Sequence, residues 1–198
     1  MSDHYYTNQP SAAHKEEEFT FDLRGKTYCF TTDTGVFSRD RVDFGSVLLI
    51  ETMQFSPQAQ VLDVGCGYGA MGLPAAVLAN EGKVTMIDIN ERAVMLAKRN
   101  AEQNGIRNVE IMVSDLYEKV ADRQFDVILT NPPIRAGKET VHRIFTEGYN
   151  LLVPGGSMWV VIQKKQGAPS AIKRLEEYFD DVQIVDKSKG YFIICARK

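Results

Sequence analysis

An acidic residue and a set of glycines stand together in the first half of the chain. Asp63 ends a short apolar run and is followed by Gly65, Gly67 and Gly69 at every second position. Glycine has no Cβ and adopts positive φ at little cost, so a ligand can approach such a loop closely. The run GYGAMG, residues 67–72, also fits the dinucleotide fingerprint GxGxxG. Against that interpretation, a carboxylate at Asp63 repels a pyrophosphate and attracts a cationic amino group.

Acidic residues also follow the next two predicted strands. Asp88 ends the apolar segment 83–88, and Asp115 follows the segment 109–113. A carboxylate at Asp88 can accept hydrogen bonds from both hydroxyls of a ribose, and we predict this role for it. Ligands of an open α/β sheet bind beyond the carboxyl ends of the strands. Asp63, Asp88 and Asp115 are therefore expected to line one crevice.

The tetrapeptide Asn131-Pro132-Pro133-Ile134 follows a fourth apolar segment. Each proline lacks an N–H and pushes the residue before it into an extended conformation, so Asn131 and Pro132 are held rigidly with free carbonyl oxygens. Two such acceptors can take both hydrogens of an exocyclic NH₂ group, which turns the nitrogen lone pair towards an approaching methyl group. We therefore predict Asn131 and Pro132 as catalytic residues, with Pro133 and Ile134 against the substrate.

The elements that must position these residues alternate regularly along the chain. Apolar segments predict strands at 61–64, 83–88, 109–113, 125–130, 158–162, 182–186 and 191–196. Amphipathic or apolar segments predict helices at 45–53, 70–80, 91–104, 138–151 and 170–179. The last two strands are too close for a helical crossover and must pair antiparallel. The expected fold is a doubly wound α/β protein whose seven-stranded sheet is mostly parallel, with an antiparallel last strand.

Smaller features surround this sheet. Residues 1–18 are polar and predict a mobile N-terminal arm, which leaves one domain at 19–198. Alternating apolar residues predict a small N-terminal hairpin within about 19–44. Pro154-Gly155-Gly156 predicts a turn before the fifth strand. Asn90 is expected to cap the helix 91–104, with Gly105 just after its last turn.

Two of these motifs resemble those of a known enzyme class. The acid and glycines at 63–69 resemble motif I of class I S-adenosylmethionine-dependent methyltransferases, and NPP at 131–133 resembles the (D/N/S)PP(Y/F/W) motif of amino-group N-methyltransferases. The resemblance implies S-adenosylmethionine as cofactor. It assigns cofactor binding to Asp63, Gly65, Gly67, Asp88, Asp115 and Leu116, with the acid after the third strand accepting from the adenine amino group. Ile134 replaces the usual aromatic residue, so it offers apolar contact without stacking.

A closer resemblance covers about residues 19–197. The segments TDTGVFS (32–38), VDFGS (42–46) and NPPI (131–134) resemble the catalytic domain of the small-subunit ribosomal RNA guanine-N2 methyltransferases, in a short branch without that family's extra N-terminal pseudo-domain. The resemblance implies methyl transfer to guanine N2 of ribosomal RNA. Phe37 would then cover the cofactor or the base, unless it is an ordinary core residue. The loop 163–167 differs from the longer relatives, so the nucleotide and the particle stay open.

Other functions compete with this interpretation. Methylation of a glutamine side-chain amide in a protein uses a closely related NPP motif. An NAD-dependent oxidoreductase is favoured only by the run at 67–72, together with the acid about 20 residues later. A noncatalytic cofactor-binding module would have no need of an intact NPP motif.

Charge is unevenly distributed along the chain. The 198 residues carry a net charge of −3, yet the segment 134–174 holds seven Lys or Arg and two acids, a balance of +5, which leaves −8 on the remainder. We predict that this segment binds RNA, with Lys138 near the entry of the base because it lies four residues beyond Ile134. The alternative is chance clustering on a solvated helix surface.

Composition excludes several classes of protein. Three cysteines without a CxxC pair indicate neither a disulfide framework nor a metal site. The longest apolar run, 191–196, is far shorter than the roughly 20 residues of a membrane-spanning helix, and the polar N-terminus lacks the apolar core of a signal peptide. We expect a cytoplasmic protein that needs no metal and no membrane. The oligomeric state is left open.

Overall fold

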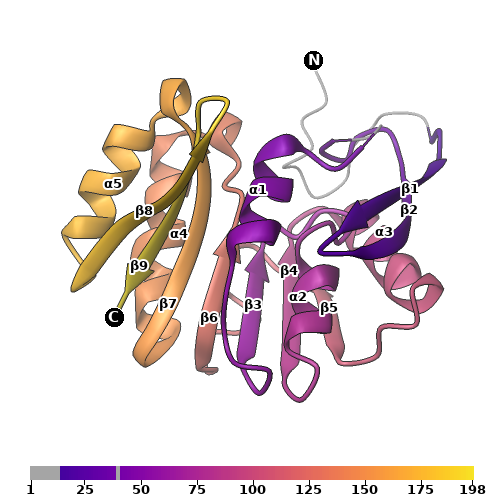
Figure 1. Ribbon diagram of the computed structural model, residues 1–198, viewed down its shortest axis with the longest axis horizontal. Helices are drawn as coiled ribbons and strands as arrows, with labels where there is room; N and C mark the ends of the chain where they lie inside the picture. The colour runs from indigo at the N-terminus through magenta and orange to yellow at the C-terminus, as the bar shows by residue number, and fades with distance from the viewer. Residues whose placement is uncertain (1–13, 39–40) are drawn as a thin grey trace.

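The computed structural model describes residues 14–38 and 41–198. In this part of the chain a seven-stranded sheet has the order β5-β4-β3-β6-β7-β9-β8 (Figure 1). Its strands are β3 (Gln60–Val64), β4 (Lys83–Asp88), β5 (Val109–Val113), β6 (Phe125–Thr130), β7 (Leu152–Gln163), β8 (Asp181–Ser188) and β9 (Tyr191–Arg197). Every pairing is parallel except the two that β9 makes. The predicted doubly wound sheet with an antiparallel last strand is confirmed.

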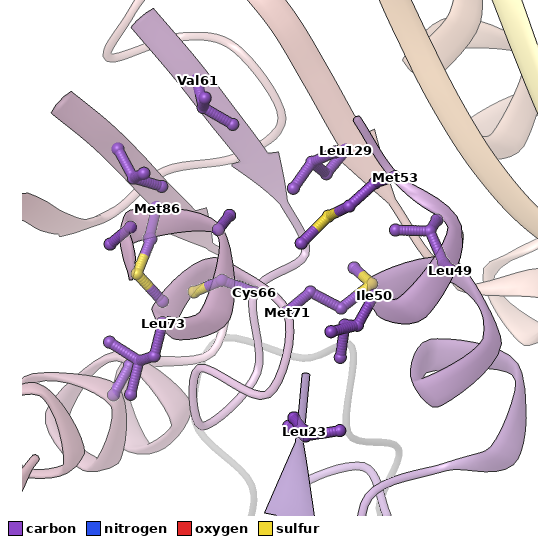
Figure 2. Packing of buried hydrophobic residues seen from close by; sticks show 14 of the residues in the cluster. Leu23, Leu49, Ile50, Met53, Val61, Cys66, Met71, Leu73, Met86 and Leu129 are labelled. Atoms are coloured by element: carbon purple, nitrogen blue, oxygen red, sulfur yellow. The ribbon is translucent and has the colours of Figure 1, made fainter. Parts of the chain in front are cut away.

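Helices cover both faces of the sheet. The buried hydrophobic residues of α1 (Phe44–Thr52), α2 (Gly72–Leu78) and α3 (Glu91–Gln103) lie in one cluster, and those of α4 (Lys138–Leu151) and α5 (Ala168–Glu176) in a second. Successive strand residues point to opposite faces, so Val61 joins the first cluster and Leu62 the second. Figure 2 shows the first cluster, where Ile50 of α1 and Met71 of the loop before α2 both contribute.

Helix ends follow the predicted chemistry at α3. The Asn90 side chain accepts hydrogen bonds from the amides of Arg92 and Ala93 at 3.0 and 3.3 Å, as an N-cap does. Gly105 follows the helix with φ of 68°, in the left-handed region that glycine tolerates. Both expectations for this helix are confirmed.

Helix α2, helix α5 and strand β7 differ most from the sequence prediction in their boundaries. Helix α2 begins at Gly72 rather than at residue 70, because Gly65, Gly67 and Gly69 all have positive φ and the loop that they form continues to Met71. Helix α5 begins and ends two to three residues earlier than expected. The predicted turn at 154–156 instead lies inside β7, where the pairing with β6 shifts its register.

A two-stranded antiparallel hairpin, β1 (Glu17–Leu23) and β2 (Lys26–Thr32), packs on α3. The side-chain amide of Asn100 accepts from the Thr31 N–H at 2.7 Å and donates to the Thr31 carbonyl at 2.9 Å. Asn104 makes the same pair of bonds to Cys29, at 2.9 and 2.7 Å. Asn100 and Asn104, which lie four residues apart on α3, therefore bond to Thr31 and Cys29, which lie two residues apart on β2.

Strand β1 begins at Glu17, so the last two residues of the range 1–18 expected for the mobile arm belong to the strand. The His14 ring and the Lys15 amide each bond a different oxygen of the Asp33 carboxylate, both at 2.6 Å. Asp33 is almost fully buried, so this contact ties the chain before β1 to the loop after β2. The rest of the predicted arm lies outside the described residues.

Candidate active site

A cleft of about 730 Å³ opens at the carboxyl ends of β3, β4, β5 and β6. It is lined by nine of the eleven residues that the sequence predicts for the site: Gly65, Gly67, Asp88, Asp115, Leu116, Asn131, Pro132, Pro133 and Ile134. The residues that line the cleft thus follow four strand ends, which all lie at the same edge of the parallel sheet. Asp63 lies fully buried beneath this surface, and Lys138 does not line it.

The glycine loop forms one wall of the cleft. Gly65 and Gly67 have φ of 75° and 56°, and a Cβ at either position would meet no atom within 4 Å. The amides of Gly65 and Cys66 both donate to the Ile87 carbonyl, at 2.9 and 3.0 Å, so the loop is fixed to the neighbouring strand β4. The loop therefore exposes open backbone to a ligand while its position is held by the sheet.

Asp88 connects this loop to the start of α3. One carboxylate oxygen accepts from the Gly67 amide at 2.8 Å and the other from the Asn90 amide at 2.9 Å. Burial raises the pKa of Asp88, and these backbone N–H groups oppose the rise. The carboxylate is thereby held at the cleft wall with a fixed orientation, suitable for accepting from a diol.

Asp63 lies beneath the loop and is fully buried. Neither of its oxygens has a hydrogen-bond partner within ordinary distance among the described residues, although the Gly72 amide is close enough to lower its pKa in part. Burial, with the neighbouring Asp88 carboxylate as a second cause, raises the pKa of Asp63 to about 7. A cation bound beside Asp63 would stabilise the ionised form of this buried carboxyl.

We expect Asp63→Asn to stabilise the protein increasingly as pH rises from 5 to 8. The folded-state pKa of about 7 lies above the ordinary 3.8, so Asp63 supports the folded state only while protonated. That contribution is fully present only below the ordinary pKa of 3.8, declines as pH rises above it and is lost once pH passes 7, whereas an asparagine does not titrate. The midpoint of thermal unfolding should therefore exceed that of the unmodified protein by roughly 2–8 °C at pH 8, and by less than half as much at pH 5. An equal difference at both pH values would contradict the raised pKa.

The third strand end contributes Asp115 and Leu116. Asp115 is exposed at the cleft, and Leu116 has φ of 45°, an unusual conformation for a branched side chain. The Ser114 hydroxyl donates to the Leu116 carbonyl at 2.8 Å, which holds the turn. This turn presents the carboxylate and the following backbone next to each other.

Asn131 and the prolines form the opposite wall. The Asn131 side-chain NH₂ donates to Oδ2 of Asp43 at 3.3 Å and to Oγ of Ser46 at 3.0 Å, both residues of the α1 start. No described residue donates to the Asn131 side-chain oxygen, and Asn131 lines the cleft. Pro132 is buried, which fixes the backbone on the inner side of the wall.

Several cleft residues escape the sequence prediction of the site. Asp43, Ser46, Arg135, Arg143, Gln166 and Tyr191 line the cleft beside the predicted residues. One feature of the sequence could have indicated Asp43, because an aspartate directly before an apolar segment is a typical helix N-cap. Phe37 also lines the cleft and is 40% exposed, so the alternative that it is an ordinary core residue is wrong.

Two absences concern the described residues. They include no group of three or more His, Cys, Asp or Glu side chains that could hold a metal ion. Within residues 14–38 and 41–198, no helix is long and apolar enough to cross a membrane.

Strand order, the glycine loop after β3 and the acids after β4 and β5 together define a Rossmann-like methyltransferase. Residues 27–195 match the family described as the methyltransferase small domain, and the chain belongs to this family. It is an S-adenosylmethionine-dependent methyltransferase, which decides against the NAD-dependent alternative. The open glycine loop and the oriented Asp88 fit this cofactor, as does the buried Asp63, whose oxygens have no hydrogen-bond partner in the part of the chain that the structure describes.

The chain is also similar to individual known proteins. The chain is 54% identical over its full length to the YbxB protein of Bacillus subtilis. It is 33% identical to the ribosomal RNA small subunit methyltransferase C of Mannheimia succiniciproducens, over 81% of this chain and 49% of that protein. The structure of the T. thermophilus 16S rRNA N2 G1207 methyltransferase in complex with AdoMet and guanosine superposes with a TM-score of 0.84 at 28% identity, covering 96% of this chain and 52% of the other. The chain spans about half the length of these two ribosomal RNA methyltransferases.

Proposed function

We propose that the protein transfers a methyl group to an exocyclic amine, the N2 of a guanine in small-subunit ribosomal RNA. The observation that carries the proposal is that Asn131 lines the cleft and its NH₂ is bonded to Asp43 and Ser46, while no described residue donates to its side-chain oxygen. Two relatives with matching sequence or fold are named for ribosomal RNA methylation, and one of them for guanine N2.

The cofactor would lie along the three strand ends. We assign its amino group to the neighbourhood of Asp63, its backbone approach to Gly65 and Gly67, its ribose hydroxyls to Asp88, and its adenine to Asp115 and Leu116. S-adenosylmethionine supplies a methyl group that is already activated by the sulfonium. The enzyme's own residues therefore have to bind, align and exclude water rather than activate the donor.

Catalysis would rest on positioning of the acceptor amine. The Asn131 side-chain oxygen and the Pro132 carbonyl accept its two hydrogens, and positive charge that develops on the nitrogen is stabilised by these dipoles. Pro133 and the apolar Ile134 lie at the same wall and would contact the base. The N–CH₃ bond would form as the S–CH₃ bond breaks, and the extra proton would pass from the charged nitrogen to water afterwards. Such a mechanism requires no strong base beside Asn131.

The test is methyl transfer to defined acceptors. Ribosomal particles from a strain lacking the gene are incubated with the purified protein and isotopically labelled S-adenosylmethionine, and the products are digested to nucleosides and amino acids. Labelled N2-methylguanosine is expected. Label recovered as N-methylglutamine in protein would establish the glutamine alternative instead, and label in another nucleoside would move the target atom.

A basic surface beside the cleft supports RNA as the partner. Arg135 lines the cleft, and Arg135, Lys164 and Lys165 are exposed with no ion-pair partner among the described residues. Arg143 and Arg174 are less available because they pair with Glu147 and Glu177. Lys138 is exposed and does not itself line the cleft, so its place near the entry of the base stays a prediction.

We expect replacement of Arg135, Lys164 and Lys165 by glutamine to weaken RNA binding about tenfold or more near 0.1 M salt. Each cation that neutralises a phosphate releases counterions, so the dependence of log Kd on log salt should flatten by about 0.7 per contact for single-stranded RNA. Filter binding across a salt series measures both effects. The matched control replaces Lys98, Arg107 and Lys119, which are exposed and do not line the cleft. Equal behaviour of the two triple variants would place the RNA face elsewhere.

A further inference from the structure

Asp43 lies where three elements meet beside Asn131. It is the N-cap of α1, and its Oδ2 accepts from the Ser46 amide at 3.2 Å and from the Asn131 NH₂ at 3.3 Å. Its Oδ1 accepts from the Tyr191 hydroxyl of β9 at 3.4 Å. Gly45 permits this approach, because a Cβ there would lie 2.6 Å from the Tyr191 ring. The Asp43 carboxylate is therefore held by bonds to α1, to β9 and to the loop after β6.

The orientation of the Asn131 amide depends on this carboxylate. An asparagine amide carries two donors on nitrogen and an acceptor on oxygen, and it fits a site equally well in shape when the two are exchanged. The Ser46 hydroxyl does not select between them, because it can donate or accept. A carboxylate only accepts, so Asp43 requires the NH₂ to face α1 and leaves the oxygen for the cleft.

We propose that Asp43 is a positioning residue that sets which end of the Asn131 amide faces the substrate. The inference rests on the proposed function, since it gives the Asn131 oxygen the task of accepting from the acceptor amine. With the amide reversed, the Asn131 NH₂ group would face the NH₂ group of the methyl acceptor. No hydrogen bond between the two would then hold the methyl acceptor. Asp43 thus acts on the reaction through Asn131, without contact to the reacting atoms.

The first test separates positioning from folding. Asp43→Ser keeps a good N-cap for α1 but removes the acceptor that orients Asn131. We expect kcat to fall at least tenfold, while KM for RNA and the Kd of S-adenosylmethionine stay within about threefold. Asp43→Asn retains an oxygen that can face Asn131 and should recover most of kcat. The matched control is Asp126→Ser, which removes a carboxylate bonded to the Gln60 amide at the far end of the sheet. Unchanged kcat in Asp43→Ser overturns the proposal.

The second test uses charge. Asn131→Asp places two carboxylates within hydrogen-bond distance, so at least one pKa of the pair rises. The kcat of this variant should fall as pH increases through that pKa, because the ionised pair repels and the introduced carboxylate leaves its position. Adding Asp43→Asn removes the repulsion, so the double variant should be more active than Asn131→Asp at pH 8 and less dependent on pH. A double variant no better than Asn131→Asp overturns the proposal.

A third measurement does not depend on the substrate. The free energies of unfolding of the unmodified protein, Asp43→Asn, Asn131→Asp and the double variant form a double-mutant cycle. We expect Asn131→Asp to be destabilising at pH 8 and Asp43→Asn to reverse most of that loss. If the unmodified protein transfers no methyl group to RNA, the proposed function fails while this cycle still reports the pairing. If the cycle shows no coupling, the pairing fails even where RNA is methylated.

Discussion

Asn131→Ala lowers kcat by an expected two to three orders of magnitude and changes the Kd of S-adenosylmethionine less than about threefold. Asn131 lines the cleft, and its NH₂ is bonded to Asp43 and Ser46, which leaves the side-chain oxygen for a substrate. Alanine removes the acceptor that would hold the amine during transfer, but no group assigned to the cofactor. Single-turnover methylation and calorimetric titration measure the two quantities separately.

Two comparisons make the Asn131 result specific. Asn150→Ala truncates an exposed asparagine that bonds the Thr146 carbonyl within α4, so it should leave both quantities unchanged. Preservation of the thermal unfolding midpoint in Asn131→Ala would exclude collapse of the wall. A large loss of cofactor affinity with normal turnover of the bound cofactor would instead make Asn131 a cofactor ligand.

Asp88→Ala should raise the Kd of S-adenosylmethionine about 10- to 150-fold. A hydrogen bond to a charged group contributes roughly 1.5–3 kcal/mol, and Asp88 is the carboxylate assigned to the ribose hydroxyls. The same carboxylate also holds the Gly67 and Asn90 amides, so the loop loses an anchor as well. Calorimetric titration of the cofactor gives the Kd directly.

Asp88→Asn distinguishes these two causes. Asparagine retains one oxygen, which can keep one backbone amide but cannot hold both amides and the diol. Its Kd should therefore lie between those of the unmodified protein and Asp88→Ala. Asp126→Ala, at the other end of the sheet, should bind normally. Undiminished affinity in Asp88→Ala would contradict the assignment of Asp88.

The sequence predicts the sheet and most of the cleft because both depend on local patterns. Strand ends are marked by apolar runs, and in a parallel sheet all of them reach the same edge, so Asp88 and Asp115 could be placed from spacing alone. The wall at Asn131 follows from the conformational restrictions of proline. Helix α2 was less predictable, since its start depends on how far the glycine loop extends.

Contacts between distant segments could not be predicted in this way. The bonds from Asp43 to Asn131 and Tyr191 join residues 88 and 148 positions apart, and nothing in local sequence specifies that geometry. Lys138 does not line the cleft, so its place near the entry of the base stays a prediction from its nearness to Ile134 along the chain. Arg135, which directly follows Ile134, lines the cleft as part of the short helix Ile134–Ala136 that precedes α4.

The two asparagines of α3 have a consequence for the behaviour of the protein at high concentration. The outer edge of a hairpin normally exposes unpaired N–H and C=O groups, which recruit strands from other molecules and initiate aggregation. Asn100 and Asn104 occupy those groups at Thr31 and Cys29, so the helix closes the edge that another chain would otherwise extend. Asn100 also donates to the Tyr68 carbonyl in the glycine loop at 2.9 Å. Loss of the Asn100 side-chain amide would therefore expose the Thr31 backbone groups at the hairpin edge, where another strand could pair, and would also loosen the glycine loop.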